Sequence, residues 1–145
     1  MPAKISPLPT VADPRPVILR ERTGGVHVAA LDPELRGADR AREVFRRVRA
    51  GDDRVADLYA EDGVVLSGGG ARVEGRETIR AFYRKTFAAI HPQPEVQVVL
   101  ESPGSNLYAV VVEVATDTGH RHALDLFTID DEGIRRLEIL NRPVD

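Results

Sequence analysis

The spacing of hydrophobic positions changes along the chain, from a helical period in the middle to a strand period near the end. Over residues 38–59 and 75–90 apolar side chains recur every three or four residues, the period of an amphipathic helix. Helices are predicted over 38–50, from Asp52 to a turn at 61–63, and from Gly75 to Ile90, where His91 and Pro92 stop the last one. This last helix is the longest and should cover a sheet.

Strand patterns fill the stretch between the second and third predicted helices and the last third of the chain. The stretch VVLSGGGARV, residues 64–73, predicts a strand, a turn and a strand. Runs rich in β-branched residues then follow over 95–102, 106–117, 120–131 and 134–142, with a glycine in each intervening turn. Short turns join antiparallel neighbours, so these four strands should form a meander. The predicted fold class is therefore α+β, with the helices first.

The first 36 residues differ from the rest in composition. They hold six of the ten prolines, which lack a backbone donor and fix φ, so regular structure is not expected before Val17. VILRER and VHVAAL around a Gly-Gly pair could form a short hairpin, and a partly disordered tail is the alternative. We therefore divide the chain into a Pro-rich N-terminal arm, 1–36, and an α+β domain, 37–145.

Composition narrows the function classes. The 145 residues carry a formal net charge of −3, and acids are interleaved with the arginines, so a nucleic-acid partner is not expected. No apolar run is long enough to span a bilayer, and the N-terminus lacks the apolar core of a secretory signal, which predicts a cytoplasmic protein. With no cysteine, thiolate nucleophiles, disulfides and Cys-ligated metals are excluded.

The strand HRHALDLFTIDD, residues 120–131, is apolar on both faces. Because side chains alternate, one face carries Ala123, Asp125 and Phe127 and the other carries Leu124 and Leu126. A sheet with helices on one side normally leaves its other side polar. We therefore expect a second subunit to cover the outer sheet face, which predicts a homodimer.

Asp125 stands out because it lies in the middle of this apolar strand. An unpaired carboxylate in hydrocarbon is costly, so the group must be paired with an arginine or tyrosine, protonated, or exposed in a cavity. The first of these is a structural role and the last two suit a functional site. The sequence alone leaves these alternatives open.

Three segments, LYAEDGVV, EGRETIRAFYRKTF and HALDLFTIDDEG-IRRLEIL, resemble the nuclear-transport-factor-2-like superfamily, which includes ketosteroid isomerases and SnoaL-like polyketide cyclases. The resemblance covers about residues 38–141. It implies a cone: a curved antiparallel or mixed β-sheet wrapped around three helices of the N-terminal half. It also implies a hydrophobic pocket between sheet and helices and an outer sheet face used for dimerisation.

The resemblance also assigns residues. It places Asp125 where ketosteroid isomerases keep a neutral acid that donates to the substrate oxyanion, a known example of a raised carboxyl pKa. Tyr59 and Tyr83 fall where that family has supporting tyrosines. The family's general base falls on Ser67, which cannot abstract a carbon-bound proton without a base of its own. Its direct tyrosine donor falls near Val44 or Phe45, so steroid isomerisation by that mechanism is not expected.

We therefore expect a small SnoaL-like enzyme that needs no cofactor and no metal, with Asp125 as general acid or base. Its substrate would be a small hydrophobic metabolite bearing a carbonyl or hydroxyl group, and the reaction a cyclisation, dehydration or isomerisation. The alternatives are a non-catalytic binding or assembly module and an epoxide hydrolase-like enzyme. For the latter, Arg121 lies on the same strand face as Asp125 but four residues away, further than a close Arg-x-Asp spacing. The expected substrate-binding residues are Tyr59, Ser67, Phe82, Tyr83, Phe87, Phe127 and Asn141.

Overall fold

The fold is known from a computed structural model that describes residues 37–143, with side chains described as far as Leu140. The predicted N-terminal arm, residues 1–36, lies outside the described residues, and so does the hairpin expected within it. Within residues 37–143, no helix is both long and apolar enough to cross a membrane.

Three helices lie in the N-terminal half of the described chain, as the hydrophobic spacing predicted, and two strands separate the second helix from the third. They are α2 (Gly37–Arg49), the 3-10 helix η2 (Asp53–Leu58) and α3 (Arg76–Ile90). The side chain of Asp52 accepts a hydrogen bond from the backbone N–H of Arg54 and so caps η2. His91 adopts a left-handed conformation, φ 46°, and its N–H bonds the Phe87 carbonyl, which ends α3 where expected.

One predicted boundary was wrong. The second helix stops at Leu58, and strand β1 (Tyr59–Leu66) runs through the expected turn at 61–63. The reason is tertiary: Tyr59 pairs with Ile134 far along the chain, and the register shifts between Tyr59 and Val64 to give a β-bulge. Gly63 fits there because a Cβ would lie 2.9 Å from the Ile134 carbonyl oxygen. Long-range pairing thus overrides the local turn signal.

Six strands form one sheet in the order β2-β1-β6-β5-β4-β3. Strands β3 to β6 form the predicted antiparallel meander, and β1 pairs antiparallel with β2 but parallel with β6, so the sheet is mixed. The remaining bounds are β2 (Arg72–Glu74), β3 (Gln93–Glu101), β4 (Leu107–Thr116), β5 (Gly119–Asp130) and β6 (Gly133–Pro143).

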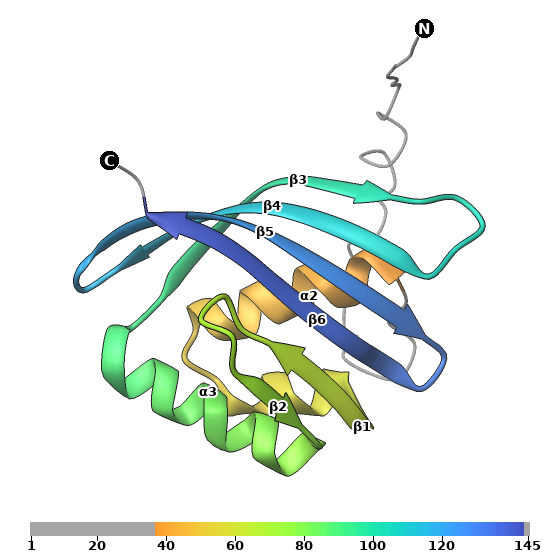
Figure 1. The fold of residues 1–145 in the computed structure, drawn as a ribbon, viewed down its shortest axis with the longest axis horizontal. Coiled ribbons are helices and arrows are strands. Elements are labelled where there is room, and N and C mark those ends of the chain that lie inside the picture. Colours follow the sequence, from red (N-terminus) through yellow and green to blue (C-terminus); the bar gives the residue numbers. More distant parts are fainter. Residues whose placement is uncertain (1–36, 144–145) are drawn as a thin grey trace, which may run out of the picture. The chain divides into compact units, whose positions relative to one another are not determined.

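The helices pack on one side of this curved sheet (Figure 1). Helix α2 lies against β3, β4 and β5, whereas α3 packs on η2 and β1. Phe45 of α2 meets Phe127 of β5 edge to face, with 5.9 Å between ring centroids. The predicted α+β fold, with a curved mixed sheet around three helices, is therefore confirmed. We call the sheet side toward the helices the inner face and the opposite side the outer face.

Candidate active site around Asp125

Asp125 lies on the inner face of β5, and it shares this face with Ala123 and Phe127, as the strand alternation predicted. Its neighbours on the same strand face, Ala123 and Phe127, are buried, and only 5% of Asp125 is exposed. Across the ladder Asp125 pairs with Val110 of β4 and Ile139 of β6. The carboxyl is therefore enclosed in the sheet plane by aliphatic and aromatic side chains.

The carboxyl of Asp125 is incompletely paired. Its Oδ1 atom is buried and has no hydrogen-bond partner among the described residues. Burial raises the pKa of Asp125 from the ordinary 3.8 to about 7, because the ionised form loses its hydration without gaining a charged partner. At neutral pH this group therefore exists as a mixture of acid and carboxylate, the condition under which a side chain can both give and take a proton.

Two tyrosine hydroxyls meet close to this carboxyl. Tyr59 Oη and Tyr83 Oη lie 2.7 Å apart in a buried hydrogen bond. Burial raises the pKa of Tyr59 well above its usual range, and the nearby Tyr83 and Asp125 raise it further. Burial also raises the pKa of Tyr83, and the nearby Asp125 raises it further, whereas the hydrogen bond to Tyr59 lowers it in part. Both phenols stay neutral, and the effect of Asp125 on each indicates that all three groups share one region.

Contacts at the N-terminus of α3 set this geometry. The guanidinium of Arg76 donates two hydrogen bonds, of 2.8 and 3.1 Å, to the backbone carbonyl of Tyr59. The N–H of Gly75 donates to the carbonyl of Gly63 over 2.8 Å. Helix α3 is thus fixed to β1 at both sides of the bulge, which lets Tyr83 reach Tyr59. Sequence reasoning missed this role of Arg76, although it follows the glycine of the EGRETI segment.

The predicted aromatic residues gather in two places. Phe82 and Phe87 contact the ring of Tyr83, with centroids 5.3 and 5.9 Å away, and both are partly exposed. Phe127 is fully buried and packs on Phe45 instead. Tyr59, Phe82, Tyr83 and Phe87 therefore form one cluster that extends from the interior toward the surface along α3. Their role in binding a substrate stays a prediction.

Ser67, which occupies the base position of the resemblance, follows the end of β1. Its hydroxyl oxygen accepts a hydrogen bond of 3.3 Å from the N–H of Ala71, so it closes the β1–β2 turn. This position therefore contributes no second acid or base to the site. Asn141 of β6 pairs through its backbone with Ala123 of β5, and the side chain of Asn141 lies outside the described part of the chain.

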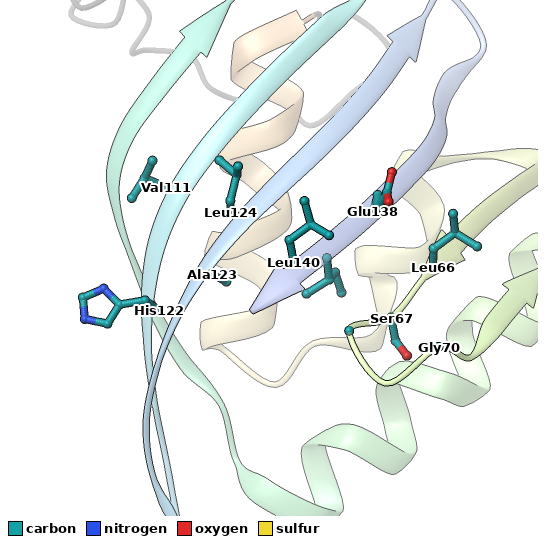
Figure 2. A pocket seen from close by; sticks show the side chains of 11 residues that line it. Leu66, Ser67, Gly70, Val111, His122, Ala123, Leu124, Glu138 and Leu140 are labelled. Carbon is teal, nitrogen blue, oxygen red and sulfur yellow. The ribbon is translucent and has the colours of Figure 1, made fainter. Parts of the chain in front are cut away.

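An open groove of about 560 Å³ lies beside the β1–β2 turn (Figure 2). Most of its lining belongs to the outer face, and of the predicted substrate-binding residues only Ser67 takes part. It also reaches Ala123 and Ile139, the strand and cross-strand neighbours of Asp125. The lining residues are Leu66, Ser67, Gly68, Gly70, Val111, His122, Ala123, Leu124, Glu138, Ile139 and Leu140.

Charged groups near the site offer little for other chemistries. Arg121, the arginine of the epoxide hydrolase alternative, is exposed, whereas Asp125 is buried. Among the residues with described side chains, no three histidine, aspartate or glutamate groups lie close enough together to hold a metal ion. The described residues thus bring one titrating acid and two neutral phenols into this region.

A curved mixed sheet packed on three helices is the architecture of the nuclear-transport-factor-2-like class of folds. The family model of the SnoaL-like domain matches residues 41–137, and the chain therefore belongs to the SnoaL-like domain family. The comparison with curated proteins finds no match.

Solved structures agree on the fold. The chain is similar to the epoxide hydrolase/cyclase-like enzyme SalBIII, which acts in pyran ring formation in the polyether salinomycin. The two are 20% identical with a TM-score of 0.63, and the match covers 71% of this chain and 88% of that one. A candidate polyketide cyclase from Sinorhizobium meliloti is 25% identical to this chain with a TM-score of 0.63, and the match covers 70% of this chain and 93% of that one. A protein with a ketosteroid isomerase-like fold from Catenulispora acidiphila, solved in complex with trimethylamine, is 14% identical to this chain with a TM-score of 0.64. The match covers 71% of this chain and 85% of that one.

Proposed function

We propose that this SnoaL-like protein is a cofactor-independent enzyme in which Asp125 transfers a proton to or from a small hydrophobic substrate that bears a carbonyl or hydroxyl group. The observation that carries the proposal is the buried Oδ1 atom without a hydrogen-bond partner. An aspartate kept only for stability would satisfy both oxygens, because an unmet buried acceptor costs about 1–3 kcal/mol. The free oxygen instead suits a ligand hydroxyl or enol.

The pKa of Asp125 supports the same role. A group with a pKa of about 7 is present in both protonation states at neutral pH, which is where general acid–base catalysis is most effective. The phenols of Tyr59 and Tyr83 stay neutral there. Because one hydroxyl donates to the other, a single phenol proton is left to donate to a substrate oxygen. Apolar side chains around Asp125 favour a hydrophobic ligand.

Among proton-transfer reactions, cyclisation is the first to test. The candidate polyketide cyclase from Sinorhizobium meliloti is 25% identical to this chain, and ring closure needs one group that accepts a proton from the attacking atom. Ser67 in place of a second acid disfavours an isomerisation that needs a separate base. A binding module without chemistry is the second candidate, favoured by the use of Ser67 in the β1–β2 turn.

Turnover of a panel of linear hydroxy-ketones and β-diketones, followed by mass spectrometry of the products, tests the proposal. Asp125→Asn should lower the rate about 10²- to 10⁴-fold, the usual contribution of a positioned acid or base. Asp39→Asn makes the same chemical change at an exposed helix position and should leave the rate unchanged. A substrate that Asp125→Asn converts at the wild-type rate would show that the carboxyl has no catalytic role.

A further inference from the structure

The groove beside the β1–β2 turn is a hollow of the outer face that the proton-transfer proposal leaves without a role. Its volume of about 560 Å³ lies within the roughly 300–1,000 Å³ that small-molecule sites occupy in proteins. The side chains of Asp125, Tyr59 and Tyr83 do not line it. The groove is therefore a candidate binding site of its own.

The floor of the groove is apolar. Leu140 of β6 pairs with Leu124 of β5, and Leu124 pairs with Val111 of β4, so the three side chains form one row across the outer face. Leu140 is 46% exposed and Leu124 37%, although both are large hydrophobic residues. An apolar molecule in the groove would remove this surface from water, which is the main favourable term in most associations.

The β1–β2 turn forms one side of the groove. Its lining residues there are Leu66, Ser67, Gly68 and Gly70. The N–H of Ser67 donates to the Ala71 carbonyl over 2.9 Å, and the N–H of Gly70 donates to the Ser67 carbonyl over 3.0 Å, so the turn is closed by two hydrogen bonds. The hollow thus has a fixed side as well as a floor, the concave shape that small-molecule sites have.

Glu138 supplies the only fixed charge among the described residues that line the groove. Its carboxylate lies between the side chains of Leu140 and Leu66 (Figure 2). The Glu138 side chain is 36% exposed, and its 3.4 Å contact with Arg136 is long for a charge-assisted hydrogen bond, which is usually about 2.7–2.9 Å. The carboxylate can therefore accept a further hydrogen bond from a ligand cation.

We propose that this groove binds a small hydrophobic amine, with its apolar body on Leu124 and Leu140 and its ammonium group against the carboxylate of Glu138. Burial of the apolar body supplies most of the affinity, because an ion pair at a partly exposed position contributes little. The ion pair supplies the selectivity, since an anion in the same place would be repelled. This inference does not depend on proton transfer by Asp125.

Fluorescence titration of the full chain with dansylcadaverine, a dansyl ring that carries a primary ammonium group, tests the apolar floor. The wild type should bind one probe per chain with a blue-shifted emission. Leu140→Gln should weaken binding about 10-fold, because the ring loses part of its apolar contact. Leu100→Gln makes the same change at a 48% exposed leucine of β3, outside the groove, and should leave the affinity unchanged. Both variants should keep the wild-type circular dichroism spectrum, since both side chains are already exposed.

Glu138→Gln tests the charge. It should weaken dansylcadaverine about 2- to 5-fold, the usual contribution of an exposed ion pair, and should leave the binding of dansylamide, which has the same ring without the ammonium group, unchanged. Equal weakening of both probes would refute recognition of a cation. Asp125→Asn should bind dansylcadaverine like the wild type, whereas a loss of binding would place the probe at the Asp125 site and overturn the inference.

Two further results would also overturn the inference. Equal affinity of Leu140→Gln and Leu100→Gln for dansylcadaverine would place the probe outside the groove. An absence of saturable binding to the wild type would mean that the groove takes no amine. In that case sedimentation velocity identifies a second copy as the occupant, if the wild type sediments with twice the 15.9 kDa chain mass and Leu140→Gln with the single mass.

Discussion

The buried carboxyl of Asp125 should make this protein less stable as the pH rises toward neutrality. The pKa of Asp125 is raised from 3.8 to about 7 on folding, so between these values the folded chain holds a proton that the unfolded chain has released. The folded state binds more protons in this window, and its free energy of unfolding therefore falls with increasing pH. The loss begins near pH 4 and is complete above about pH 7.

The size of this effect follows from the pKa change. About 3 pH units at about 1.4 kcal/mol per unit give about 4 kcal/mol, an order-of-magnitude value for one buried group. Asp125→Asn removes the titration, so its stability relative to the wild type should improve by about this amount from pH 4 to pH 8. The buried asparagine amide has its own cost, but that cost is the same at each pH and cancels in the comparison.

Urea unfolding of both proteins, followed by circular dichroism at several pH values between 4 and 8, measures the difference. Asp39→Asn, on the exposed side of α2, serves as a control whose difference from the wild type should stay constant. The reasoning is refuted if the wild type and Asp125→Asn change in parallel over this range, because the carboxyl would then be solvated or paired in the folded chain.

Two further predictions concern residues that build the site. Tyr83→Phe removes one partner of the 2.7 Å hydroxyl pair and should lower the free energy of unfolding by about 1–3 kcal/mol. The double variant Tyr59→Phe with Tyr83→Phe should lose less than the sum of the two single losses, because neither hydroxyl is then left without its partner. Additive losses would contradict a direct hydrogen bond between the two side chains. Gly133→Ala should lower the melting temperature more than Gly104→Ala, because a Cβ at 133 lies 2.9 Å from the Leu58 carbonyl oxygen whereas one at 104 meets nothing, and both positions have positive φ. Equal shifts would show that conformation alone matters at these glycines.

Local patterns in the sequence accounted for most of the fold. The hydrophobic periodicity of each long helix and strand can be read from the residues of that element alone, so α2, α3 and the meander were predictable. The alternation along β5 also grouped Asp125 with Ala123 and Phe127 on one strand face, but it did not tell which face of the sheet meets the helices. The end of η2 was not predictable in this way, because Tyr59 becomes a strand residue only through its parallel pairing with Ile134.

The candidate site was less accessible to sequence reasoning. The contact between Tyr59 and Tyr83 depends on how Arg76 fixes α3 to β1, which no local pattern expresses. The resemblance placed Ser67 at the base position, whereas the structure shows its hydroxyl within the β1–β2 turn. The groove arises where that turn passes β6. Because the turn and β6 are distant in sequence, the position of the groove could not be inferred from either segment alone.

The titration of the Asp125 side chain tests the central claim most directly. Carbon-13 NMR of the aspartate carboxyl signals, with Asp125→Asn used to assign the resonance, reports the protonation of this one group in the folded chain. The account predicts a midpoint near pH 7. A midpoint near or below pH 4 would contradict it, because it would mean that a hydrogen bond or a cation stabilises the carboxylate and that no proton is available at neutral pH.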